Sequence, residues 1–435
     1  MKFHFEDHKL GRTALSVSEK EISWYNHDMI IEKIIPGGMS LGTMNDGRKI
    51  FFWNALPGET VVEYEVTKRK SNYYEAIATK IDNPSSYRVK PQDSCYLSTS
   101  PWQIMDYDYE LHQKQSLVVE IFREHGITID TPEIITDGKD YHYRNKMEYA
   151  LYWNNNTFQI ELAFHQRGSH RKFPITQSSI ERPEIFARAR DIIDDLNSHH
   201  EEARKYQSLL LRCNQAGEVS GGLYENRKPH PKFTPLTDKI LGYTYSYSPN
   251  GFFQINLPVY ELALQEIKKH ITTNEVFDLY AGVGTIGLSV ARDKHLTLVE
   301  CDKPAFVEMA KNITIEDISE PGKARISAGR PWRRAGRTRV RNGDIFAALS
   351  KSEDALSYIK PSQTVILDPP RAGCDRKLIN KLLEAKPQKI IYLSCNPATQ
   401  ARDVKLLLEK YQIKKIKTFN FFPHTPHIEN LIILS

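Results

Sequence analysis

The feature that most constrains the fold of this chain is a regular alternation of short apolar runs and helical stretches that begins at Glu275. The runs are VFDLY, LTLVE, RTRVRN, TVILDPP and KIIYLSC, and a helical stretch follows each of them. Because strands that alternate with helices form parallel βαβ units, we predict a doubly wound α/β sheet that binds its ligand at the carboxyl edge of its strands. The last two runs, KIKTFNFF and NLIILS, have no helix between them and should pair antiparallel.

The 435 residues suggest two or three domains. Residues 29–82 contain short strands separated by turn signals, a pattern typical of a small five-stranded barrel. Barrels of this kind often bind oligonucleotides, and an assembly module is the alternative. A helix over 103–125 is expected to pack with the α/β domain. The expected domains are a barrel over 25–85, a central α+β domain over 86–247 and the α/β domain over 248–435.

Composition excludes several classes of protein. Charged residues make up 26% of the chain, the mean hydropathy is −0.51 and no apolar run is long enough to span a bilayer, so an integral membrane protein is excluded. Five scattered cysteines form neither a disulfide framework nor a paired CxxC metal site. The start, MKFHFEDHKLGR, lacks a signal-peptide core. We therefore expect a reduced, cytoplasmic protein without a metal site.

The net charge of +5 is modest, but it is unevenly distributed. The segment 321–342 carries eight Lys or Arg residues and no acidic residue. Such a block is either a solvated loop or a contact for a polyanion. The block alone favours the solvated loop.

A glycine-rich loop follows the first strand of the α/β region. In DLYAGVGTIG, the residues Gly282, Gly284 and Gly287 have the GxGxxG spacing that lets a nucleotide approach the backbone closely. Glu300 ends the next strand, where a carboxylate can accept both hydroxyls of a ribose. The pattern fits NAD or another nucleoside cofactor, and a turn needed only for helix packing is the alternative.

Three further residues stand at the expected ligand edge. Asp368 ends a strand at the rigid sequence LDPPRAG, and Cys395 ends the next strand at LSCNPAT, just before a helix expected near Thr399. The positive end of that helix should lower the pKa of the thiol, which makes Cys395 a candidate nucleophile. Glu429 enters the apolar final strand and either faces solvent or has a chemical role; taken alone, it is expected to face solvent.

Several motifs, in their order along the chain, resemble the S-adenosylmethionine-dependent RNA 5-methyluridine methyltransferases. They are SPNGFFQIN, DLYAGVGTIGLSVA, LDPPRAG, YLSCNPATQARDV and FPHTPHIE, and GGMSLG…DGRKIFF…ALPGE is similar to the TRAM domain that many members carry. The resemblance covers about Ile30 to Ser435. It implies a Rossmann-like class I methyltransferase domain behind a TRAM barrel, S-adenosylmethionine as cofactor, ribosomal or transfer RNA as partner, no membrane association and a monomeric enzyme.

The resemblance also assigns roles to individual residues. Cys395 matches the nucleophile and Glu429 the general base. Glu300 matches the ribose-binding acid, and Asp344 the adenine-side acid. The other cofactor-binding positions it implies are Gln254, Tyr280, Gly282, Gly284, Thr285 and Asp368.

The chemistry explains why these residue types are required. C5 of uracil is a poor nucleophile, so a thiolate must first add at C6 and generate an enolate that attacks the methyl group. A carboxylate must then remove the C5 proton before the thiol is eliminated. Because a base edge inside a helix is inaccessible, the uridine should be flipped out of a loop or a disrupted stem. The barrel and the basic block would hold the flanking RNA.

One departure from the family concerns an iron–sulfur cluster. Many relatives bind a cluster through a CxxxxxCGGC run and a later cysteine, whereas the matching region here, DSCYLSTSPWQ, contains only Cys95. Four thiolates cannot be assembled, so no cluster is expected.

Three other functions are compatible with parts of the pattern. Methylation at C5 of cytidine also uses a cysteine adduct, but a TC dipeptide is expected there and this chain has SCNP. A non-catalytic RNA-binding protein on a methyltransferase fold would not need Cys395. An NAD dehydrogenase ranks last. The resemblance of the barrel to the TRAM domain favours ribosomal over transfer RNA as the substrate.

Overall fold

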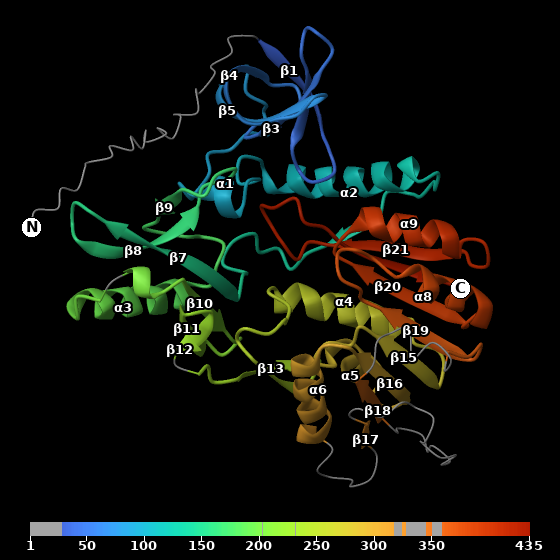
Figure 1. Ribbon diagram of the computed structural model, residues 1–435. Helices are drawn as coiled ribbons and strands as arrows, with labels where there is room; N and C mark the ends of the chain where they lie inside the picture. The colour runs from blue at the N-terminus through green and yellow to red at the C-terminus, as the bar shows by residue number, and fades with distance from the viewer. Residues whose placement is uncertain (1–27, 202, 231, 317–323, 328–344, 350–358) are drawn as a thin grey trace, which may run out of the picture.

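The computed structural model describes residues 28–201, 203–230, 232–316, 324–327, 345–349 and 359–435. The barrel is the uppermost part of Figure 1, the central sheet lies to the left, and the large sheet with its helices fills the right and the bottom. Within the described ranges, no helix combines the length and the apolar character needed to cross a bilayer.

The N-terminal strands form a closed barrel in the order β1-β2-β3-β5-β4. The alternation of the strands turns Ile50, Phe52 and Tyr64 into the barrel, where they are almost fully buried. Trp53 and Tyr73 stay only partly buried on its outside. The predicted small barrel is confirmed, with strands β1 (Met29–Ile34), β2 (Ser40–Thr43), β3 (Lys49–Trp53), β4 (Thr60–Arg69) and β5 (Tyr73–Asp82).

The central part contains an antiparallel sheet in the order β12-β11-β10-β7-β8-β9. Helix α3 (Pro183–Ser198) covers it with an apolar stripe that includes Ile185, Ala189 and Ile193. The strands are β7 (Lys146–Asn154), β8 (Gln159–His165), β9 (Lys172–Pro174), β10 (Ser208–Cys213), β11 (Val219–Glu225) and β12 (Lys228–His230). Short elements complete this part, namely α1 (Tyr96–Thr99), η1 (Ala203–Lys205) and the hairpin of β13 (Leu236–Ile240) and β14 (Tyr243–Tyr247).

The α/β part is built on a nine-stranded sheet in the order β17-β18-β16-β15-β19-β20-β22-β21-β6. The strands from β17 to β20 in this order pair in parallel, as the alternation predicts. Strand β22 pairs antiparallel with both β20 and β21, which confirms the predicted pairing of the last two runs. The strands are β15 (Glu275–Leu279), β16 (His295–Glu300), β17 (Ala324–Ser327), β18 (Ile345–Leu349), β19 (Gln363–Leu367), β20 (Lys389–Ser394), β21 (Ile413–Phe419) and β22 (Glu429–Leu434).

The helices of this part connect and cover the strands. They are α4 (Leu257–Lys269), α5 (Thr285–Val290), α6 (Lys303–Glu316), α8 (Arg376–Ala385) and α9 (Pro397–Leu407). The run RTRVRN, expected as the third strand, lies outside the described residues, and β17 and β18 stand on either side of it.

Two elements that precede the central sheet in sequence belong spatially to the large sheet. Helix α2 (Tyr107–Glu124) begins four residues later than expected, at a turn capped by Asp106, and it packs its Leu117, Val118 and Phe122 into the same core as α8 and α9. Strand β6 (Glu133–Ile135) pairs in parallel with β21 at the sheet edge. The N-terminal half of the chain therefore completes the layer that carries the candidate site.

Candidate active site

The predicted site residues meet where the parallel strands end. Asp368 directly follows β19 and Cys395 directly follows β20. Glu429 is the first residue of antiparallel β22, so it arrives at the same edge from the opposite direction. Because Ser394 pairs with Asn430, the next position of the register sets Cys395 against Glu429.

Backbone geometry explains the glycine-rich loop. Gly282 and Gly284 have φ values of 57° and 89°, and Gly284 caps α5 in the left-handed conformation that favours glycine. Gly287 has a different reason, since a Cβ there would lie 2.6 Å from Leu298 Cδ2. The first two glycines shape the loop, and Gly287 lets α5 approach the sheet. Thr285 is the buried first residue of α5.

Hydrogen bonds to the Glu300 carboxylate connect this loop to the end of β16. Its Oε2 accepts a hydrogen bond from Gly282 N at 2.8 Å, and its Oε1 accepts from Cys301 N and Asp302 N, each at 2.6 Å. Its carboxylate is therefore held in a fixed place between the glycine loop and the chain that leaves β16. That is the place where the sequence predicts a ribose.

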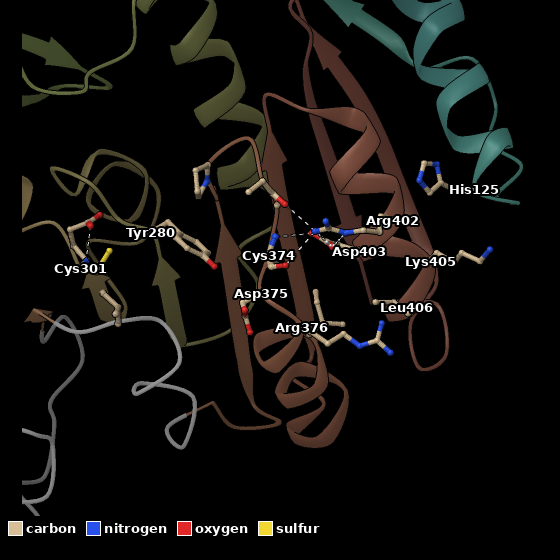
Figure 2. A pocket seen from close by; sticks show the side chains of 16 residues that line it. His125, Tyr280, Cys301, Cys374, Asp375, Arg376, Arg402, Asp403, Lys405 and Leu406 are labelled. Atoms are coloured by element: carbon tan, nitrogen blue, oxygen red, sulfur yellow. Dashed lines mark hydrogen bonds and ion pairs between the residues drawn. The ribbon is translucent and has the colours of Figure 1, made fainter. Parts of the chain in front are cut away.

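A cavity of about 1130 Å³ runs along this edge and past α9. Figure 2 shows Tyr280 and Cys301 toward one end, and Lys405 and His125 toward the other. Glu300, Pro370 and the segment 372–376 also line it. Among the lining residues, Cys301 is exposed and Cys374 is buried.

Cys395 does not have the low pKa expected from the helix dipole. Burial raises the pKa of its thiol to about 11, and the carboxyl groups of Glu429 and Asp368 add to this rise, while Arg371 opposes it. The expected lowering is wrong because α9 begins at Pro397 and the side chain of Asn396 already caps it by accepting from Ala398 N. Desolvation and the nearby carboxyl groups outweigh the dipole.

Glu429 is also buried, with only 3% of its surface exposed, so the solvent-facing alternative is wrong. Burial and the neighbouring Asp368 raise its pKa well above the usual value of a glutamate, and Arg371 lowers it in part. Burial raises the pKa of Asp368 to about 7. Two carboxyl groups and a thiol thus lie close enough to influence one another, and burial favours their protonated forms.

Arg371 and His427 form the partly exposed side of this pocket. Arg371 Nη2 lies 3.0 Å from His427 Nδ1. Burial and the Arg371 charge lower the pKa of His427 to about 4, so its ring is neutral at pH 7 and accepts from the guanidinium. The side chains of Asn396 and Thr399 donate to Arg371 O and fix this segment against the start of α9. The motif LDPPRAG contains Arg371, but a sequence alone does not reveal its contact with His427.

Asp278 is a further site residue that the sequence reasoning missed. It is fully buried beneath the glycine loop, and its Oδ2 accepts from Gly287 N at 2.8 Å. Burial raises its pKa to about 8, and Asp368 and Glu300 contribute. The signal that could have found it is an acid at the end of an apolar strand, directly before a glycine loop.

The remaining predicted residues have separate positions. Gln254 is buried before α4, and its backbone carbonyl accepts from Asn145 Nδ2 of the central part at 3.0 Å. Asp344 lies outside the described residues, as does most of the basic segment 321–342, of which only the backbone of β17 is described. The described ranges contain no group of three or more His, Cys, Asp or Glu residues able to hold a metal ion.

Comparison with known proteins gives a family. Residues 235–435 match the family described as tRNA (Uracil-5-)-methyltransferase. The match covers 201 of the 435 residues, and this part of the chain is similar to that family. The resemblance based on the sequence motifs is thereby confirmed, together with the expected class of S-adenosylmethionine-dependent RNA (uracil-5-)-methyltransferases.

Curated RNA methyltransferases are similar to nearly the whole chain. An uncharacterized RNA methyltransferase of Synechocystis is 26% identical, and the alignment covers 96% of each protein. Another from Enterococcus faecalis is 29% identical over 90% of this chain and 93% of its own. Among solved structures, the Pyrococcus abyssi tRNA (uracil-54, C5)-methyltransferase in complex with S-adenosyl-L-homocysteine matches 94% of this chain and 100% of its own, with a TM-score of 0.69 and 22% identity. That likeness confirms the methyltransferase fold.

Proposed function

We propose that this enzyme transfers a methyl group from S-adenosylmethionine to C5 of a uridine in structured RNA, through a transient bond between Cys395 and C6 of the base. The observation that carries the proposal is the meeting of Cys395 and Glu429 at one sheet edge, on adjacent antiparallel strands and beside Asp368. A thiol and a separate buried carboxyl group facing one position are what the addition and the elimination require.

The described residues fit the cofactor at the glycine loop. The Glu300 carboxylate, fixed by three backbone amides, would accept the ribose hydroxyls, and Tyr280 and Cys301 line the same cavity. Gln254, Thr285 and Asp368 are the further positions proposed to hold the cofactor, and Asp344 would hold its adenine side. When bound, S-adenosylmethionine supplies an electrophilic methyl group on a positively charged sulfur.

Cys395 carries out the first step in this proposal. With a pKa of about 11, only about one thiol in 10⁴ is ionised at pH 7 before ligands bind. A positive charge placed beside Asp368 favours the thiolate by direct attraction, so the nucleophile gains reactivity when the cofactor arrives. The sulfur then bonds to C6, and the ring electrons move toward C5 and O4.

Glu429 completes the reaction after C5 has gained its methyl group. Its carboxylate takes the C5 proton, the electrons of that C–H bond form the C5=C6 double bond, and the C6–S electron pair returns to Cys395. The raised pKa of Glu429 makes its carboxylate a stronger base than an exposed glutamate. The Arg371 guanidinium counteracts this rise and supports the charged form that abstraction needs.

The likeness of the N-terminal barrel to the TRAM domain favours ribosomal over transfer RNA as the substrate. Its partly buried rings, Trp53 and Tyr73, are suited to stacking on bases. The domain limits expected from the sequence are retained as part of this proposal, and so is a monomeric enzyme without an iron–sulfur cluster. RNA from cells with and without the gene, analysed by nucleoside mass spectrometry, would identify the RNA class and the modified position.

The covalent step is tested with target RNA that carries 5-fluorouridine. Fluorine at C5 cannot be removed as a proton, so the wild-type enzyme should remain bonded to the RNA in denaturing gels. Cys395→Ala should abolish both this complex and turnover. Normal turnover by Cys395→Ala would show that the chain is not this kind of enzyme, and methylation found only on cytidine would favour the cytidine alternative.

A further inference from the structure

The loop that delivers Glu429 is held by side chains from the distant helix α2. Residues 420–428 connect β21 to β22, and the final pair of that register is Phe419 with Glu429. The position of Glu429 therefore depends on how this loop leaves β21 and returns to β22. Residues 420–428 themselves contain no helix or strand.

Lys114 and Glu110 of α2 contact the loop at three points. Lys114 Nζ donates to Asn420 Oδ1 at 2.6 Å and to Phe422 O at 3.0 Å. Glu110 Oε2 accepts from His424 N at 2.8 Å. The two side chains also form an ion pair, with Lys114 Nζ 2.7 Å from Glu110 Oε1, and both are fully buried.

Neighbouring groups hold the same loop from other sides. Trp102 donates through its backbone N to His424 O, and through its indole Nε1 to Gly38 O of the barrel, each at 3.0 Å. Tyr143 Oη donates to Pro423 O at 3.0 Å. His424 itself has a φ of 59°, a left-handed conformation that is uncommon for residues other than glycine.

Stability alone does not explain a buried ion pair at this place. Replacing such a pair by apolar side chains of similar volume is often neutral or stabilising, because burial of two charges costs free energy that their attraction hardly recovers. The pair fixes the position of one loop, because each charged side chain hydrogen-bonds to backbone or amide groups of that loop. That loop ends at the residue proposed as the general base.

We propose that Lys114 and Glu110 are positioning residues that set the place of Glu429 for removal of the C5 proton. The inference rests on the proposed function. It predicts a selective defect, because addition of Cys395 and methyl transfer come before Glu429 acts. A displaced Glu429 should leave the methylated RNA bonded to the enzyme instead of slowing every step.

The test is the double variant Lys114→Met with Glu110→Gln, which removes both charges and keeps side chains of similar size. Turnover should fall about 10- to 100-fold, the loss typical of a reacting group displaced by about 1 Å. Ordinary uridine RNA should then accumulate as a denaturant-stable complex with the enzyme. Formation of the complex with 5-fluorouridine RNA should stay within about twofold of wild type, because this complex forms before Glu429 acts as general base.

Two further variants keep the test decisive. Lys33→Met with Glu120→Gln removes the exposed ion pair between the barrel and α2, which does not touch the loop, and should behave as wild type. Tyr143→Phe removes one hydrogen bond to the loop and keeps the ring. The covalent complex with ordinary uridine RNA should also accumulate in this variant, to a smaller extent than in the double variant, and it can be measured even if the double variant fails to fold.

The possible results separate this inference from the function on which it rests. Unchanged turnover in folded double variant, or an equal loss of turnover and of 5-fluorouridine trapping, would overturn the positioning role. If the double variant does not fold, absence of the accumulated complex in Tyr143→Phe would overturn it. Failure of the wild-type enzyme to trap 5-fluorouridine RNA would overturn the proposed function, and the inference with it.

Discussion

The thiol of Cys395 should ionise far more reluctantly than an ordinary cysteine. Burial and the carboxyl groups of Glu429 and Asp368 raise its pKa to about 11. At pH 8 about one such thiol in 10³ is a thiolate, compared with about a quarter of ordinary thiols with a pKa near 8.5. Because only the thiolate reacts with iodoacetamide, Cys395 should be alkylated about 200-fold more slowly at pH 8 than an ordinary accessible cysteine.

The assay follows the alkylation rate of each cysteine-containing peptide by mass spectrometry between pH 7 and pH 11. A cysteine in a short unstructured peptide added to the mixture is the reference, because burial and Glu300 raise the pKa of Cys301, and Cys395→Ala verifies the assignment of the slow peptide. The rate for Cys395 should still be rising at pH 10. A plateau reached below pH 9 would refute the reasoning, because it would mean that the helix dipole outweighs burial and the carboxyl groups.

Charge on the ligand gives a second reading of the same experiment. S-adenosylmethionine carries a positive sulfur, whereas S-adenosylhomocysteine has nearly the same shape without that charge. If the charge favours the thiolate, alkylation of Cys395 should be faster with S-adenosylmethionine than with S-adenosylhomocysteine at equal saturation. Equal rates would contradict the proposed electrostatic activation.

Four further predictions follow from the site. Glu429→Gln should lower turnover by about 10²- to 10⁴-fold and accumulate a covalent complex on ordinary uridine RNA, seen on denaturing gels. Glu300→Gln should weaken S-adenosylmethionine binding, measured by calorimetry, and should also lower the melting temperature, because its amide nitrogen cannot accept one of the backbone hydrogen bonds that the carboxylate accepts. Gly284→Ala should cost about 1–3 kcal/mol in denaturant unfolding, because φ is 89° and the new Cβ would lie 2.8 Å from Leu288 Cδ1. Turnover should fall as the pH drops through about 7, because Asp368 has a raised pKa and loses there the negative charge proposed to hold the cofactor. A rate that is flat from pH 6 to 8 would contradict this.

Much of the α/β part could be predicted because its signals are local. Alternating apolar runs gave the parallel strands, and the missing helix between the last two runs gave the antiparallel pairing of β21 with β22. The glycine loop was visible because Gly282 and Gly284 are needed for their own backbone conformation. These features depend on residues close together in the chain.

What could not be predicted depends on packing between distant segments. The pKa of Cys395 is set by burial and by Glu429 and Asp368, which reach it from other strands, and its place before a helix therefore pointed in the wrong direction. The loop that precedes Glu429 is likewise contacted by Lys114, which lies about 300 positions earlier in the sequence. An ion pair inside an amphipathic helix looks in sequence like any solvated i,i+4 pair.

Strand β6 forms the edge of the large sheet, although it lies far from the rest of that sheet in the sequence. It adds to β21, and Asn420 N donates to Ile135 O just beyond that pairing. A fragment of residues 248–435 would keep every residue of the proposed chemistry. It would also expose the edge of β21 to solvent and lack the apolar side chains that α2 adds to the core. Grafting this catalytic half onto another RNA-binding module would therefore require residues 107–135 to be carried along as part of the enzyme.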